Sequence, residues 1–384
     1  MKRIIFILIL ILIVSENVYG QDEVLEEYIS IYSSEMEEVI SDSETAENIE
    51  EIIPGFDTEE LIRKSVSGES LFDVKSLINR LLALLFREIK NVLKIMLYIM
   101  AISVLTSYLS ALPEWKSREV SDIAFYGCYI IIAGICAAGF VEIVKCGKDA
   151  INSLIMIAKI IVPIVSACLV GAGAVVSASA FQPVLLSVIG ISLYVIEKFF
   201  MPALMLFASL NIVNCLSDKF NIEKMINLVG RIIKWGISIL LTIFVGSAGL
   251  QSLASGGADG ISVKIAKYAA SNLIPFVGGI LSETVETVMS CSMVIKNAVG
   301  ITGIIIIVAV MIIPLIKISA CLIVLRLTSS LIQPVTDVRI VKCVSGIADA
   351  VGLVFSITLA VTVMFIIILT IMLNAGSSAI MLGK

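Results

Sequence analysis

The sequence contains no histidine, and this absence excludes several kinds of catalytic site. Serine and cysteine nucleophiles that depend on an imidazole base are excluded, as are the HExxH zinc motif and histidine proton relays. No Ser/Lys spacing stands out as a nucleophile and base pair either. We therefore expect that the chain is not an enzyme.

Charged residues are also scarce. They make up 15% of the 384 residues, whereas a soluble protein of this length has about 25%. No basic cluster is interleaved with aromatic side chains on a polar surface, so we expect no nucleic-acid partner.

The eight cysteines form no CxxC pair, and most of them lie within apolar runs. This pattern is typical of buried thiols and not of a disulfide framework or a zinc site. The acidic part of the chain lacks the D-x-[DN]-x-[DN]-G calcium loop. We expect neither a metal nor another cofactor.

What the chain has in abundance is apolar sequence. Hydrophobic residues make up 59% of the chain, and the mean hydropathy is +1.06. One water-soluble core cannot bury so much apolar surface. The composition therefore predicts an all-α polytopic membrane protein, with the lipid bilayer as its surroundings.

The first twenty residues are typical of a secretory signal peptide. Lys2 and Arg3 precede an apolar core, Ile4–Val14, that is too short to span a bilayer. An uncleaved anchor that runs a little longer is the alternative. In both cases the segment 21–70 is expected on the extracytoplasmic side.

The segment 21–70 is acidic. Residues 21–60 contain fifteen Asp and Glu and no Lys or Arg. Pro54-Gly55 predicts a turn between two short helical pieces. We interpret the segment as solvated and facing partner proteins.

Residues 71–91 predict an amphipathic juxtamembrane helix, because apolar residues recur at steps of three and four. A membrane domain follows, with a first part at 92–250 and a second part at 299–384. Its apolar runs predict about seven transmembrane helices: Val92–Leu112, Ile123–Val144, Ile151–Val176, Val184–Val213, Ile232–Leu250, Val299–Leu325 and Val351–Leu373. The fourth run is either one kinked helix or two short helices that meet at Glu197-Lys198.

Four charged residues lie within these apolar runs: Lys159, Glu197, Lys198 and Lys317. A charge at the bilayer centre costs at least about 2.5–3.5 kcal/mol, so such side chains usually face a partner, a cavity or a pore. The alternative is that the lysines extend towards the headgroups. We predict that at least one of the four has an interior or cavity-facing role.

Residues 251–298 combine a glycine-rich loop with two half-polar pieces that are not apolar enough to span. They predict re-entrant or interfacial helices, since irregular backbone at membrane depth requires shelter by protein or water. The segment is a candidate for lining a passage or docking a partner, through Gly256, Gly257, Gly260, Lys264, Lys267, Pro275, Gly278 and Gly279.

The same stretch carries a family resemblance. "GLQSLASGGADG" (249–260), followed by AKYA, IPFVGG, SETVETV and KNAVG up to residue 300, is similar to the central segment of the stage III sporulation protein AE family. The order of signal peptide, acidic segment, amphipathic helix and polytopic body agrees over essentially the whole chain.

The resemblance implies a location and a set of partners. Members of the family lie in the mother-cell-derived membrane around the forespore, within a channel-like complex that supports forespore development after engulfment. The implied partners are a cytoplasmic ATPase, ring-forming proteins and a YidC/Oxa-type insertase for biogenesis. The family provides no catalytic or ligand residues to transfer.

A secondary transporter or permease that acts alone is the alternative function. The intramembrane charges favour it, as does a weak repeat between "IIVPIVSACLV" (160–170) and "IIPLIKISACLIV" (312–324).

Overall fold

The computed structural model describes residues 30, 33–34, 43–67, 74–111, 118–216, 222–246, 249 and 278–374. Helices account for nearly all of these residues, and the described part of the chain contains no strand. The predicted all-α class is therefore confirmed. The signal peptide, residues 1–20, lies outside the described residues.

Six helices in the described ranges are long and apolar enough to cross a membrane. They are Lys75–Leu109, Ile123–Gly171, Ile189–Asn214, Glu223–Gly246, Met289–Ile332 and Val338–Asn374. The chain is thus a multi-pass membrane protein, in agreement with the prediction of about seven spans.

The described residues contain one span fewer than predicted, and the reason lies in α6, Arg118–Gly171. This single helix of 54 residues contains the second predicted span and most of the third, which was predicted to continue to Val176 although α6 ends at Gly171. Charged residues between the two apolar runs lower the local hydropathy. Such residues are nevertheless as compatible with a helical backbone as apolar residues are. At 1.5 Å per residue α6 is about 80 Å long, more than twice the thickness of a bilayer's hydrocarbon.

The fourth predicted run is one continuous rod. It consists of α7 (Val175–Val195), a π-helical segment η2 (Ile196–Phe200) and α8 (Met201–Asn214). Pro202 lies in the first turn of α8. A proline ring clashes with the carbonyl four residues earlier, here that of Lys198, and the wider π turn relieves such a clash. Of the two predicted arrangements, the single helix is therefore the observed one.

The end of the segment 251–298, which the structure describes from residue 278, does not have the predicted re-entrant or interfacial form. Residues 280–298 do not form a separate short helix, because α10 runs unbroken from Gly278 to Ile332. Polar residues within an otherwise apolar helix lowered the local hydropathy without ending the helix. A five-residue connection then leads to α11, Val338–Asn374.

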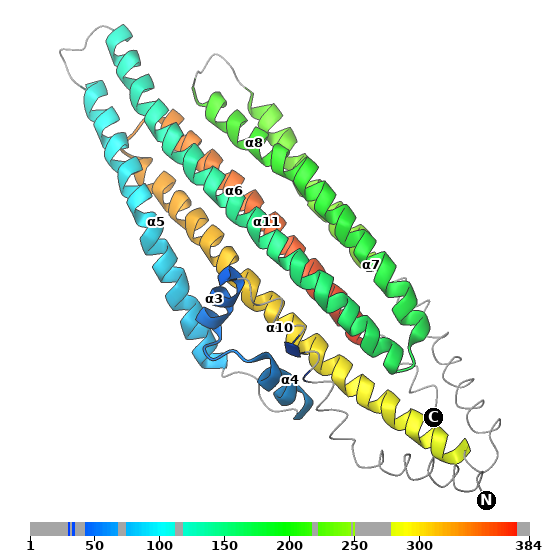
Figure 1. Cartoon of the computed structure of the whole chain (residues 1–384). Helices are drawn as coiled ribbons and strands as arrows, with labels where there is room; N and C mark the ends of the chain where they lie inside the picture. The colour runs from blue at the N-terminus through cyan, green and yellow to red at the C-terminus, as the bar shows by residue number, and fades with distance from the viewer. Residues whose placement is uncertain are drawn as a thin grey trace, which may run out of the picture.

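The predicted juxtamembrane helix also continues into the first span. Residues 74–111 form α5, Val74–Ala111, so the proposed boundary at residue 91 is not a helix end. In Figure 1, α5, α6, α10 and α11 run side by side as an elongated bundle, with the α7–α8 rod along one side.

Two short helices pack on the outside of this bundle. α3 (Ser43–Ile52) and α4 (Thr58–Ser67) are joined by a turn in which Gly55 has φ 70°, so the predicted turn at Pro54-Gly55 is confirmed. Both helices contact α10, and Figure 1 shows α4 beside the middle part of α10. The apolar face of the pair is buried, including Ile49, Ile52 and Ile62.

The outer face of α4 is polar. Arg63 pairs with Glu59 at 2.7 Å, and Lys64 pairs with Glu60 at 2.6 Å, all four side chains being well exposed. Helices with such a face are stable in water or against a protein, but not against lipid chains. The outer face of α4 is therefore not a lipid-facing surface.

Candidate functional site

The charged pair predicted in the fourth run lies on the π-helical segment η2. Nζ of Lys148 on α6 donates to a carboxylate oxygen of Glu197 at 3.2 Å, and both side chains are about half exposed. The pair connects η2 with α6 across 49 residues of sequence. π-helical turns often mark functional positions, so this contact is a candidate site.

A second ion pair joins the two C-terminal helices. Arg326 of α10 donates to the carboxylate of Asp349 on α11. Both residues line a cleft of about 410 Å³, together with Arg231 and Lys234 from the helix Glu223–Gly246. Three basic side chains thus surround one carboxylate, and the cleft has a net positive charge.

The two ion pairs lie within about half a bilayer thickness of each other along the bundle. Gly147, next to Lys148, faces Val354 and Thr358 of α11, about 8 and 14 Å along that helix from Asp349. On the other rod, Phe200 packs on Gly236, two residues beyond Lys234. We call the following six residues the charged level: Lys148, Glu197, Arg231, Lys234, Arg326 and Asp349.

An apolar layer follows on one side of the charged level. No charged residue occurs in α7, in Asn297–Ile316 of α10 or in Ala350–Leu373 of α11. The α10 and α11 stretches lie beside each other and beside α6, because Gly303 of α10 faces both Ile161 and Leu369. The facing part of α6, residues 150–171, carries one charge, the exposed Lys159. About 20 helical residues span about 30 Å, the thickness of one hydrocarbon core.

Lys296 marks the far end of this layer. It is fully buried, and its Nζ donates to the carbonyl of Leu373 at 2.7 Å, in the last turn of α11. The last carbonyls of a helix have no partner within the helix, and a cation there also complements the helix dipole. Lys296 therefore ties the end of α11 to α10.

The sequence prediction did not single out Lys296, because it assigned residues 251–298 to an interfacial segment. A usable signal was present: Lys296 immediately precedes twenty residues without a charge. Such a position indicates the boundary of an apolar layer.

The four predicted intramembrane charges do not converge on one site. Glu197 forms the pair described above, and Lys198 and Lys159 are exposed, whereas Lys317 is half-buried on α10. Lys159 lies eleven residues beyond Lys148, or about 16 Å along α6.

The predicted passage segment is described only at its end. Gly278 and Gly279 are the first two residues of α10. Gly256, Gly257, Gly260, Lys264, Lys267 and Pro275 lie outside the described residues. Among the described residues, no group of three Cys, Asp or Glu is placed to hold a metal ion.

Residues 56–376, which comprise α4 and the whole described bundle, match the family model of stage III sporulation protein AE. The chain belongs to this family. A stage III sporulation protein AE of Bacillus subtilis (strain 168) is 26% identical over 318 residues, which cover 83% of this chain and 80% of the relative. No solved structure matches the chain. Membership supports a role in sporulation for this multi-pass protein.

Proposed function

We propose that the chain is a non-enzymatic component of a channel-like complex in the membrane around the forespore, required for forespore development after engulfment. The observation that carries the proposal is that the bundle has two unlike faces. One face carries the polar helices α3 and α4, whereas α5 beside them and the side opposite to them expose large apolar side chains, among them Phe86, Tyr98 and Tyr108 of α5.

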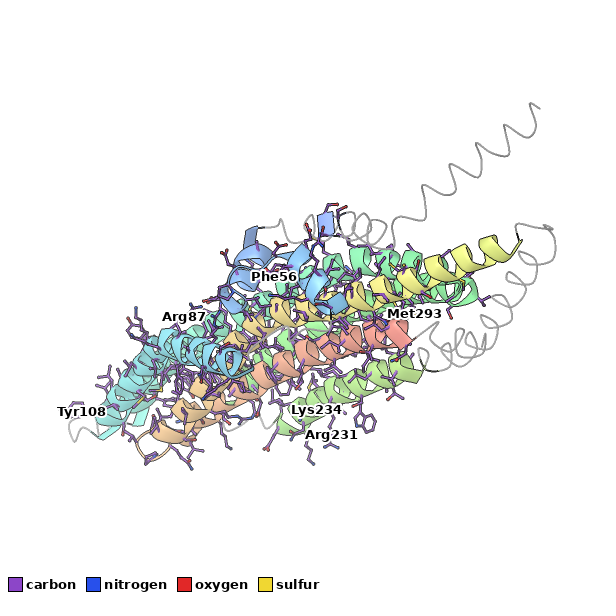
Figure 2. All side chains as sticks on the ribbon, turned by 90° about the horizontal axis from the view of Figure 1, so that it is seen from below. Phe56, Arg87, Tyr108, Arg231, Lys234 and Met293 are labelled. Atoms are coloured by element: carbon purple, nitrogen blue, oxygen red, sulfur yellow. The ribbon has the colours of Figure 1, made fainter. Side chains whose placement is uncertain are left out.

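The side opposite to α3 and α4 is formed by α7 and the helix Glu223–Gly246, which expose large apolar side chains next to a few charged ones. Its exposed side chains include Ile191, Tyr194, Trp235, Ile239 and Ile243. Figure 2 places Arg231 and Lys234 of this face on the side of the bundle opposite to Phe56 and Arg87 of the α3–α4 side. A subunit with water or protein on one side and lipid on the other is what the wall or base of a multi-protein complex requires.

The α3–α4 side is the proposed contact for extracytoplasmic partners. Glu51 of α3 pairs with Arg87 of α5, which holds the acidic helices against the bundle. Ring-forming proteins are the expected partners there, and a cytoplasmic ATPase would contact the opposite membrane face. An insertase of the YidC/Oxa type is the expected biogenesis partner.

Deletion of the gene in a spore-forming host tests the proposal. We expect development to stop after engulfment, and a plasmid copy of the full chain to restore it. A Glu59→Lys/Glu60→Lys chain should accumulate in the membrane but fail to restore development, since it replaces the two acid–base pairs on the outer face of α4 with four basic side chains. Normal spore yield in the deletion strain contradicts the proposal.

The ion pair on η2 favours a second candidate, a transporter that acts alone. Purified protein in liposomes would then take up a solute, and Glu197→Gln or Lys317→Ala would abolish uptake. Uptake without partner proteins favours the transporter, and its absence together with a post-engulfment arrest favours the complex component.

A further inference from the structure

The positively charged cleft is not explained by the proposed function. Its lining combines Asn227, Arg231 and Lys234 of one helix with Arg326 of α10 and Asp349 and Ser356 of α11. We propose that this cleft binds the phosphate group of an anionic phospholipid.

The cleft has an excess of positive charge. Asp349 neutralises Arg326 through their ion pair. Arg231 and Lys234 form no ion pair with the residues that the structure describes, so two positive charges remain on one side of the cleft. A planar guanidinium beside an ammonium group is a common arrangement for binding phosphate oxygens.

Small residues in the lining create the space in the cleft. Gly230 and Gly352 lie in its lining, with Phe207 and Leu353 beside them. The volume of about 410 Å³ is large enough for a phosphate group and part of the glycerol to which it is attached.

The position of the cleft favours a lipid as the source of the phosphate. The cleft belongs to the charged level, and the apolar layer begins directly beyond it. Trp235, which follows Lys234, is 70% exposed, and tryptophan is enriched where hydrocarbon meets headgroups. Ile239 and Ile243, 56% and 65% exposed, continue the same face of the helix into the layer.

A bound lipid would therefore meet two complementary surfaces. Its phosphate would contact Arg231 and Lys234, and its acyl chains would lie along Trp235, Ile239 and Ile243. Basic pockets between transmembrane helices bind anionic headgroups in this way. Arg231 and Lys234 of the cleft lie on the side opposite to Phe56 and Arg87, where lipid can reach them (Figure 2).

Trp235 provides a native reporter for the test. The full-length protein carries two tryptophans, and a Trp115→Phe chain leaves Trp235 as the single one. Its fluorescence would be titrated with brominated phosphatidylglycerol and with brominated phosphatidylcholine, in mixed micelles at constant ionic strength. We expect quenching at a several-fold lower mole fraction of the anionic lipid.

Four variants distinguish binding in the cleft from an effect of general surface charge. Arg231→Gln and Lys234→Gln should each reduce the preference for the anionic lipid about fivefold. Lys224→Gln, on the same helix but outside the cleft, should leave it unchanged. Asp349→Asn should increase the preference, because it removes the carboxylate and releases Arg326; this opposite sign cannot result from misfolding.

Several results would overturn the proposal. One is equal quenching by the two lipids, and another is an equal effect of Lys224→Gln and Lys234→Gln. A third is that millimolar inorganic phosphate abolishes the preference for the anionic lipid, whereas chloride at the same ionic strength, the control, does not. That third result would assign the cleft to a free anion instead of a lipid.

Discussion

Lys296 is a buried charge whose role can be measured. Replacing it with methionine keeps the volume but removes the donor to the carbonyl of Leu373. An unsatisfied buried acceptor costs about 1–3 kcal/mol, so we expect Lys296→Met to lower the melting temperature in detergent. Lys159→Met, at an exposed position on α6, is the matched control and should change stability little. Equal melting temperatures for the two variants would contradict the assigned contact.

Asp337 caps the first turn of α11. Its Oδ1 accepts from the backbone N–H of Arg339 at 2.8 Å, and its Oδ2 lies 3.1 Å from the Arg339 guanidinium. Loss of such a cap costs about 1 kcal/mol. We expect Asp337→Ala to destabilise the protein in thermal melts, whereas Asp337→Asn keeps a capping oxygen and should lose less. Equal losses from both substitutions would argue against capping.

The same carboxylate predicts a pH dependence. Partial burial acts to raise its pKa, but the hydrogen bonds and charge of Arg339 outweigh this, and the pKa of Asp337 falls below its ordinary value of 3.8. A lowered folded-state pKa gives stability that is complete at neutral pH and is lost as the pH falls through that pKa. The gap in melting temperature between the parent and Asp337→Asn should therefore narrow between pH 7 and pH 3. A constant gap would contradict the shift.

At the scale of the elements, glycines set how closely helices approach. A Cβ atom at Gly346 of α11 would lie 2.4 Å from Oδ1 and 2.9 Å from Cβ of Asn211 on α8. Relief of this clash requires movement of the α8 backbone, and overpacking of this kind costs about 1–3 kcal/mol. We expect Gly346→Ala to lower the melting temperature and to speed hydrogen exchange in α8.

Gly352 of α11 is the control for that substitution. Its nearest neighbour would be Cδ1 of Leu322 at 3.8 Å, which is ordinary van der Waals contact. Gly352→Ala should therefore be tolerated. Destabilisation of the same size at both positions would indicate a general intolerance of alanine and not the contact between α8 and α11.

At the scale of the whole molecule, burial predicts thiol reactivity. Seven of the eight cysteines are buried, and Cys146 is half-buried. A maleimide reagent should therefore modify the folded protein at Cys146 at most, and all eight thiols only after denaturation in SDS. A Cys146→Ala chain should remain unlabelled when folded. Labelling of several thiols in the folded state would contradict the packing of α6, α10 and α11.

Several features were predictable from the sequence because they depend on local chemistry. The membrane class follows from the total apolar content, and the turn at Pro54-Gly55 follows from the backbone freedom of glycine. The family could be identified from residues 249–300. Each of these inferences requires only the residues within a short window or a sum over the chain.

Other features required the fold. Hydropathy falls at the charged residues in the middle of α6 and near Lys296 of α10, yet both helices continue, because their backbone hydrogen bonds do not depend on side-chain polarity. The contact of Glu197 with Lys148 and that of Lys296 with Leu373 join residues 49 and 77 positions apart. A local sequence pattern gives no information on the distance between residues so far apart in the chain. The composition therefore determined that the chain enters lipid, whereas the packing of the helices decided which of its charged side chains contact one another.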